Sequence, residues 1–221
     1  MRWPRTVSKI ALILGTGANI GQATVNNYKN SGYRVATVSR TAQPTTDTTE
    51  KNSIVHFTAD FADPSSIEPI FDQVQTHFGA APDVVIYNAA LMIITPTNPF
   101  DIPLTDFTKA LNINTVSPYY AAGVAYARNN KIIFIYTGNG MNTMLDPKIT
   151  SLGIGKAGSA HFIEEAAKEE FLRPAQFYYC DQRRLDGTPC YTGLSGQAHA
   201  DLYIKLAQNT EQADPLIVFR A

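Results

Sequence analysis

Three glycines lie within seven residues near the start of the chain, in the run GTGANIG at positions 15–21. Glycine allows a turn tight enough for backbone N–H groups to face a phosphate, and the N-terminus of a following helix favours negative charge. An apolar run at 9–14 precedes the turn and a helix-compatible stretch follows it. This context predicts a turn that binds the pyrophosphate of a dinucleotide, rather than a plain connection between strand and helix. The residues expected to form it are Gly15, Gly17, Asn19, Ile20 and Gly21.

The next apolar run, 33–38, ends at Ser39 and Arg40. A site for NAD usually has an acidic residue at this point, which binds the ribose hydroxyls. A hydroxyl and a guanidinium instead suit a 2′-phosphate, because arginine pairs with phosphate through two parallel hydrogen bonds. The pair therefore predicts NADP(H) as the cofactor, and the alternative for Arg40 is a solvated surface side chain.

The apolar pattern of the chain predicts the elements that must position these residues. Runs rich in β-branched and aromatic residues are expected as strands at 9–14, 33–38, 53–58, 83–87, 131–136, 176–180 and 215–219. Helices are expected at 18–30, from Asp63 and Pro64 to Phe78, and at 105–128, 152–171 and 196–208, with a loop at 41–52.

Because strand and helix alternate throughout, the chain is expected to form an α/β fold. We predict one Rossmann-type domain over residues 1–221, with a doubly wound parallel sheet between two helical layers. In such folds the ligand lies beyond the carboxyl ends of the strands.

The composition is typical of a globular protein and points away from several other classes. The 221 residues carry a net charge of −1, so binding to nucleic acid or to an anionic membrane surface is not expected. Two cysteines, Cys180 and Cys190, fit reduced thiols in a cytoplasmic protein better than a disulfide scaffold. The apolar run at 10–14 is too short for a signal peptide or a membrane span. No metal site is expected, because the histidines are dispersed: His56, His77, His161 and His199.

The glycine turn and several residues after later strands resemble the short-chain dehydrogenase/reductase family, from residue 9 to about residue 171. Asn19 stands where the family has a middle glycine, and asparagine tolerates left-handed backbone angles. Asp60 resembles the family's adenine-contacting aspartate. Asn88, in Asn-Ala-Ala, resembles the asparagine that borders the cofactor, and Asn114 resembles the active-site asparagine.

The catalytic core of that family is a serine after the fifth strand, followed by a tyrosine and a lysine four residues apart on one helix face. The lysine lowers the tyrosine pKa and holds the nicotinamide ribose, while the tyrosine passes a proton to the substrate oxygen. Lys156 matches the lysine and Thr137 matches the serine. At the tyrosine position stands Leu152, which carries no proton.

The resemblance therefore leaves the proton donor open. Asp181 could donate if its pKa were raised beside the nicotinamide, or it could be a loop carboxylate paired with Arg183 or Arg184. A displaced tyrosine is the other possibility, although each candidate could equally be a core or rim aromatic: Tyr136, Tyr178, Tyr179 and Tyr191. The expected catalytic residues are Asn114, Thr137, Lys156 and Asp181, and the expected cofactor contacts beyond the turn are Ser39, Arg40, Asp60, Asn88 and Lys156.

Three functions fit this scaffold, because fold alone does not decide function. The first is an NADPH-dependent reductase of a carbonyl, enone or imine in a small organic molecule. The second is a non-redox cyclase or isomerase, and the third is a catalytically silent NADP(H)-binding protein. The presence of Lys156, Asn114 and Thr137 favours the reductase, whereas Leu152 argues against it.

The resemblance also implies a homo-oligomer, either a dimer or a tetramer. Pairing is expected through the two long helices at 105–128 and 152–171. The second helix carries small residues that would allow close approach of a partner: Gly155, Ala157, Gly158 and Ala160.

Overall fold

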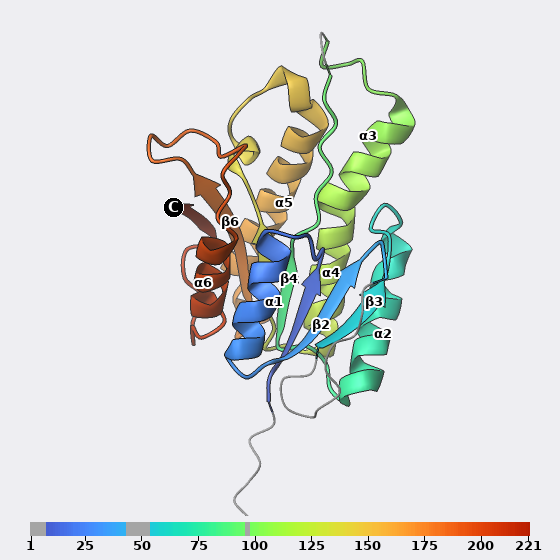
Figure 1. Ribbon diagram of the computed structural model, residues 1–221, viewed down its shortest axis with the longest axis vertical. Coiled ribbons are helices and arrows are strands. Elements are labelled where there is room, and N and C mark those ends of the chain that lie inside the picture. Colours follow the sequence, from blue (N-terminus) through green and yellow to red (C-terminus); the bar gives the residue numbers. More distant parts are fainter. Residues whose placement is uncertain (1–7, 43–53, 96–97) are drawn as a thin grey trace, which may run out of the picture.

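The computed structural model describes residues 8–42, 54–95 and 98–221, and these form a three-layer α/β/α fold. Seven strands in this part of the chain make one sheet of order β3-β2-β1-β4-β5-β6-β7, in which every pair is parallel (Figure 1). The strands are β1 (Ile10–Leu14), β2 (Arg34–Ser39), β3 (Ile54–Thr58), β4 (Val84–Tyr87), β5 (Ile133–Thr137), β6 (Gln176–Arg183) and β7 (Leu216–Arg220). The predicted doubly wound Rossmann-type fold is confirmed.

Helices cover both faces of the sheet (Figure 1). They are α1 (Ile20–Asn30), α2 (Ile67–Phe78), α3 (Leu104–Leu111), α4 (Ser117–Arg128), α5 (Thr150–Lys168) and α6 (Gly196–Leu206). Successive residues of a strand point to opposite faces. Ala11 and Ile13 of β1 therefore pack with α1 and α6, whereas Leu12 and Leu14 pack with α2, α4 and α5.

The helix expected at 105–128 is interrupted, which is a difference from the prediction. A π-helical turn at Asn112–Val116 separates α3 from α4. Pro118 follows this turn and has no N–H, so the carbonyl of Asn114 lacks its α-helical donor. That carbonyl instead accepts hydrogen bonds from Tyr136 Oη at 2.9 Å and from Ser159 Oγ at 2.7 Å. The interruption thus exposes a backbone acceptor to the centre of the fold.

Two further boundaries differ from the sequence prediction. Strand β6 continues to Arg183, three residues beyond the expected end at Cys180, because it pairs with β7 over this stretch. Helix α5 ends at Lys168 and a separate 3-10 turn covers Glu170–Leu172. The loop expected at 41–52 lies almost entirely outside the described residues. In the described ranges, no helix is long and apolar enough to cross a membrane.

Candidate active site

The glycine turn is built so that a side chain would disrupt it. Gly15 has φ +105°, and a Cβ added there would lie 2.5 Å from the backbone nitrogen of Ala89. A Cβ added at Gly21 would lie 2.7 Å from Thr16 Cα. Gly17 has no atom within 4 Å of its added Cβ, so it borders open space. The turn therefore packs tightly on the chain after β4 while its outer backbone is free to meet a ligand.

Asn19 does not need the tolerance of left-handed backbone angles that it shares with glycine. Its φ is −97°, and its side chain extends to the start of α6. Nδ2 donates to the carbonyl of Leu194 at 2.8 Å, and Oδ1 accepts from the N–H of Gly196 at 3.1 Å. Asn19 therefore joins the glycine turn to α6, and Ile20 behind it packs in the core.

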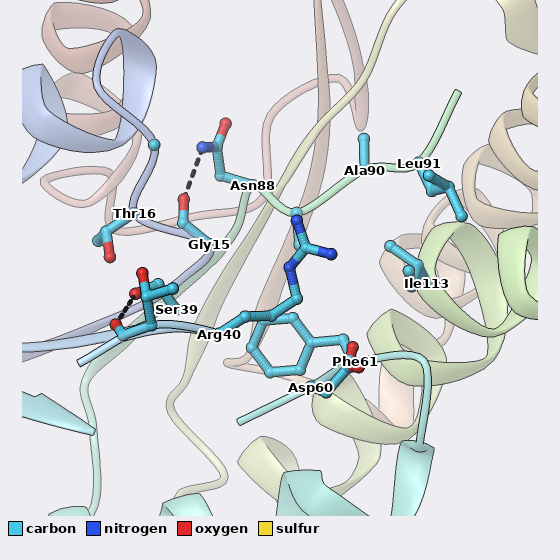
Figure 2. A pocket seen from close by; sticks show the side chains of 13 residues that line it. Gly15, Thr16, Ser39, Arg40, Asp60, Phe61, Asn88, Ala90, Leu91 and Ile113 are labelled. Carbon is cyan, nitrogen blue, oxygen red and sulfur yellow. Dashed lines mark hydrogen bonds between the residues drawn. The ribbon is translucent and has the colours of Figure 1, made fainter. Parts of the chain in front are cut away.

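A cavity of about 350 Å³ opens beside the turn at the carboxyl ends of β1 to β4. Figure 2 shows the Arg40 guanidinium extending into this space, between Gly15 and Asn88 on one side and Leu91 and Ile113 on the other. The lining comes from five segments of the chain: Gly15, Thr16 and Gly17; Ser39, Arg40 and Thr41; Asp60 and Phe61; Asn88, Ala89, Ala90 and Leu91; and Ile113. Most of the predicted cofactor contacts therefore meet in one cavity.

Of the polar side chains in this cavity, Asn88 and Ser39 are hydrogen-bonded to backbone carbonyls, whereas Asp60 and Arg40 are exposed. Asn88 supports the turn, because its Nδ2 donates to the carbonyl of Gly15 at 2.8 Å (Figure 2). Asp60 is exposed at the rim, with Oδ1 accepting from the N–H of Ala62 at 3.0 Å. Ser39 donates to the carbonyl of Thr41 at 2.7 Å, while Arg40 is exposed. Among the residues that line the cavity, Arg40 therefore supplies the positive charge with which a phosphate could pair.

Asn114 and Lys156 lie deeper, where α5 and the π-helical turn meet β5. The Asn114 side chain is fully buried and holds Leu91, accepting from its N–H at 3.1 Å and donating to its carbonyl at 2.7 Å. Lys156 is 2% exposed, and its Nζ donates to Tyr136 Oη at 2.9 Å and to the carbonyl of Thr137 at 2.8 Å. Burial lowers the pKa of Lys156 to about 7, although the nearby Asp181 carboxylate acts in the opposite direction.

The tyrosine candidates are placed very differently from one another. Tyr136 and Tyr179 are register partners whose rings stack at 5.4 Å, and burial raises the pKa of both. Tyr179 donates to the carbonyl of Asn139 at 2.7 Å, so its hydroxyl is occupied. Tyr178 faces the other side of the sheet, with its hydroxyl on Gln176. Tyr191 is half-exposed and donates to Asp146 Oδ2 at 3.3 Å.

The structure does not bring the Thr137 hydroxyl to Lys156. Because neighbouring strand residues point to opposite faces, Tyr136 faces α5 and Thr137 faces α6. Thr137 Oγ1 lies 2.8 Å from Tyr203 Oη on α6, and only its carbonyl contacts Lys156. Of Thr137, only the backbone carbonyl therefore joins Lys156 in the predicted group, and the hydroxyl does not.

Asp181 is a strand residue, not the loop carboxylate that the sequence suggested. It is 2% exposed in β6, and Oδ2 accepts a hydrogen bond from Arg183 Nε. Its Oδ1 is buried without a hydrogen-bond partner. Burial raises the Asp181 pKa, and this effect is opposed by Arg183 and by Lys156. The pairing with Arg183, rather than with Arg184, is the one that forms.

Leu152 forms an apolar wall one turn before Lys156 on α5. It is 4% exposed and packs with Met141, Ile149 and Met144. The residue that sequence reasoning did not connect with Lys156 is Tyr136, which it considered only as a displaced proton donor. Within the described residues, no group of three His, Cys, Asp or Glu side chains could hold a metal ion.

Comparison with known proteins decides the family. The family pattern for short chain dehydrogenases matches residues 9–173, which is most of the chain. The chain belongs to the short chain dehydrogenase family. The matched range contains the glycine turn, Lys156 and, four residues before the lysine, Leu152.

Individual relatives agree with this assignment. The short chain dehydrogenase/reductase dmxR12 of Cryptosporiopsis sp. is 37% identical, over 96% of this chain and 92% of that protein. A metagenomic short-chain oxidoreductase solved with NADP has a TM-score of 0.81 at 15% identity, over 97% of this chain and 98% of that one. The NADH-dependent reductase A1-R′ solved with NAD has a TM-score of 0.79 at 17% identity, over 96% and 95%. Both structures share the fold, and they were solved with different cofactors.

Proposed function

We propose that this short chain dehydrogenase is an NADP(H)-dependent reductase of a carbonyl, enone or imine in a small organic molecule. The observation that carries the choice of cofactor is the cavity at the end of β2, where Ser39 and Arg40 stand in place of an acidic residue. Two parallel hydrogen bonds from a guanidinium fit a 2′-phosphate, and no carboxylate at this strand end repels it.

The residues present fit a nicotinamide dinucleotide. Gly15 and Gly17 would face the pyrophosphate, because neither residue has a side chain to obstruct it and α1 begins directly after the turn. Arg40 would hold the 2′-phosphate, and Asp60 would contact the adenine of the cofactor. When bound and reduced, the cofactor would supply a hydride to an electrophilic carbon of the substrate.

A direct test combines purified protein, NADPH and a panel of carbonyl and imine compounds, followed through the absorbance of the cofactor. Consumption of NADPH together with a reduced product supports the reductase. Formation of product without cofactor consumption would instead identify an isomerase or cyclase. Tight NADPH binding without any turnover would instead identify a silent binding protein, the alternative to which Leu152 and the occupied Thr137 hydroxyl point.

Replacing Arg40 by alanine should weaken NADPH binding and leave NADH binding nearly unchanged. One charged hydrogen bond contributes about 1.5–3 kcal/mol, so we expect a loss of about 10- to 100-fold in NADPH affinity. Calorimetric titration of both cofactors into wild type and variant measures this. Equal weakening of both would show that Arg40 does not bind the 2′-phosphate.

We also propose that the protein forms a dimer or tetramer through the α4 and α5 layer. Two of the small residues named for this contact serve the chain itself, since Gly155 packs on Asn114 and Gly158 packs on Thr115. The same layer nevertheless leaves Val116, Tyr119 and Ile154 exposed, which supports an apolar contact with a second copy. Light scattering at micromolar concentration should give at least twice the monomer mass, and a monomer would refute the proposal.

A further inference from the structure

The ammonium group of Lys156 is held in place by two hydrogen bonds, which leaves one of its three hydrogens without an acceptor in the described part of the chain. A protonated lysine has three donors. Two of them are taken by Tyr136 Oη at 2.9 Å and by the Thr137 carbonyl at 2.8 Å, and the ammonium also lies 4.3 Å from the centre of the Tyr136 ring. Since the side chain is 2% exposed, water cannot compete freely for this position. Among the described residues, the third hydrogen has no acceptor.

Tyr136 can accept from Lys156 because its own proton is committed elsewhere. Its hydroxyl donates to the Asn114 carbonyl at 2.9 Å, the carbonyl that Pro118 leaves without a helical donor. A phenol that donates in one direction presents its lone pairs in the other. The chain of contacts from the Asn114 carbonyl through Tyr136 to Lys156 therefore fixes where the ammonium points.

We propose that Lys156 is the proton donor of this site and that Tyr136 is the residue that positions it, an inference that rests on the proposed reductase function. As hydride reaches the substrate carbon, the carbon–oxygen π pair moves onto oxygen. An O–H bond then forms while an Nζ–H bond of Lys156 breaks, leaving a neutral amine that regains a proton from water. Leu152 stands at the position where the resemblance to the family implies a proton-donating tyrosine, so it supplies no proton.

The charges around Lys156 suit this role. Asp181 on β6 favours the ammonium, whereas burial favours the neutral amine, and these opposing effects place the lysine pKa at about 7. Tyr136 on β5 and Tyr179 on β6 have pKa values raised by burial, so both remain neutral at working pH. A general acid is most effective when its pKa lies near the operating pH.

The positioning role can be tested without any substrate. Protein labelled with carbon-13 at lysine Cε is titrated by NMR, and the Lys156 signal is assigned by its loss in Lys156→Met. Tyr136→Phe keeps the stacked ring but removes the acceptor of the ammonium. Because loss of a charged hydrogen bond disfavours the ammonium, the Lys156 titration midpoint should fall by about one to two pH units.

Tyr87→Phe is the matched control. Tyr87 stacks on Tyr136 at 5.8 Å from the neighbouring strand and donates to the Ile113 carbonyl at 2.7 Å, but no hydrogen bond joins it to Lys156. This variant should leave the Lys156 midpoint unchanged. An unchanged midpoint in Tyr136→Phe, or equal shifts in both variants, would overturn the positioning role.

The donor role is tested with NADPH and an activated carbonyl such as isatin. At saturating NADPH, Lys156→Met should lower kcat by about 10²- to 10⁴-fold, the contribution of a positioned acid. The alkaline limb of the wild-type kcat profile should follow the NMR midpoint, and it should shift with it in Tyr136→Phe. If Lys156→Met keeps the wild-type kcat, Lys156 is not the donor. If wild type consumes no NADPH with any carbonyl or imine, the reductase function itself fails, and with it the donor role.

Discussion

Leu152→Tyr should create or raise ketone reductase activity in this protein. The substitution places a phenol one helical turn before Lys156, on the same face of α5. A positioned general acid contributes about 10²- to 10⁴-fold to rate, and because Lys156 is proposed to supply part of this contribution already, that range is the upper limit of the expected gain. We expect at least about tenfold in kcat/KM, because the phenol must also be held at reactive geometry. Reduction of a simple ketone by NADPH is the measurement.

The control for this gain is Leu152→Phe. Leu152 packs among Met141, Met144 and Ile149, and flexible methionine side chains can move to admit a ring. Phenylalanine tests this rearrangement without adding a hydroxyl, so it should show no gain. If wild type already reduces simple ketones at ordinary rates and Leu152→Tyr slows it, a donor already present is being displaced. The placement of the acid at position 152 would then be wrong.

Arg183→Met should destabilise the fold strongly. Arg183 and Asp181 are 8% and 2% exposed, and Arg183 Nε is the hydrogen-bond donor to the Asp181 carboxylate. Since Asp181 Oδ1 already lacks a hydrogen-bond partner, the variant would leave both carboxylate oxygens in the interior without the Arg183 hydrogen bond. Breaking a buried pair in this way costs about 3–5 kcal/mol, to be measured by urea unfolding at neutral pH. Arg184→Met removes an exposed neighbour and should change the free energy of unfolding little.

The loss in Arg183→Met should depend on pH in a defined direction. Burial already raises the folded pKa of Asp181, and removing Arg183 removes a cause that lowers it. A carboxyl whose folded pKa is raised contributes stability below its unfolded pKa and loses this contribution as pH rises through the folded pKa. The variant should therefore be closest to wild type in acid and furthest from it at neutral pH. A deficit that grows as the pH falls would contradict this arrangement of charges.

The sheet and the cofactor cavity were predictable because both depend on short-range patterns. Buried parallel strands are continuous apolar runs, and each of those runs in this chain became a strand of the sheet. The residues at the carboxyl ends of parallel strands meet at one edge, so Gly15, Arg40 and Asn88 could be placed together from their positions in sequence.

The deeper part of the site could not be predicted, because its contacts depend on which face each side chain takes. Tyr136 and Thr137 face opposite sides of the sheet because of the register of β5, and a shift of this register by one residue would exchange their two faces. The interruption at Asn114 did have a sequence signal, because Pro118 lies inside the range expected as one helix and cannot donate to the carbonyl four residues before it. Asn19 was judged by backbone tolerance, whereas its side chain determines its role.

The measurement that bears most directly on the proposed function is titration of NADPH and of NADH into the wild-type protein under the same conditions. With Arg40 in the cavity and no acidic residue at the end of β2, NADPH should bind with a Kd lower by about tenfold or more, which corresponds to about 1.4 kcal/mol. Equal Kd values, tighter binding of NADH, or no binding of either cofactor would contradict an NADP(H)-dependent reductase.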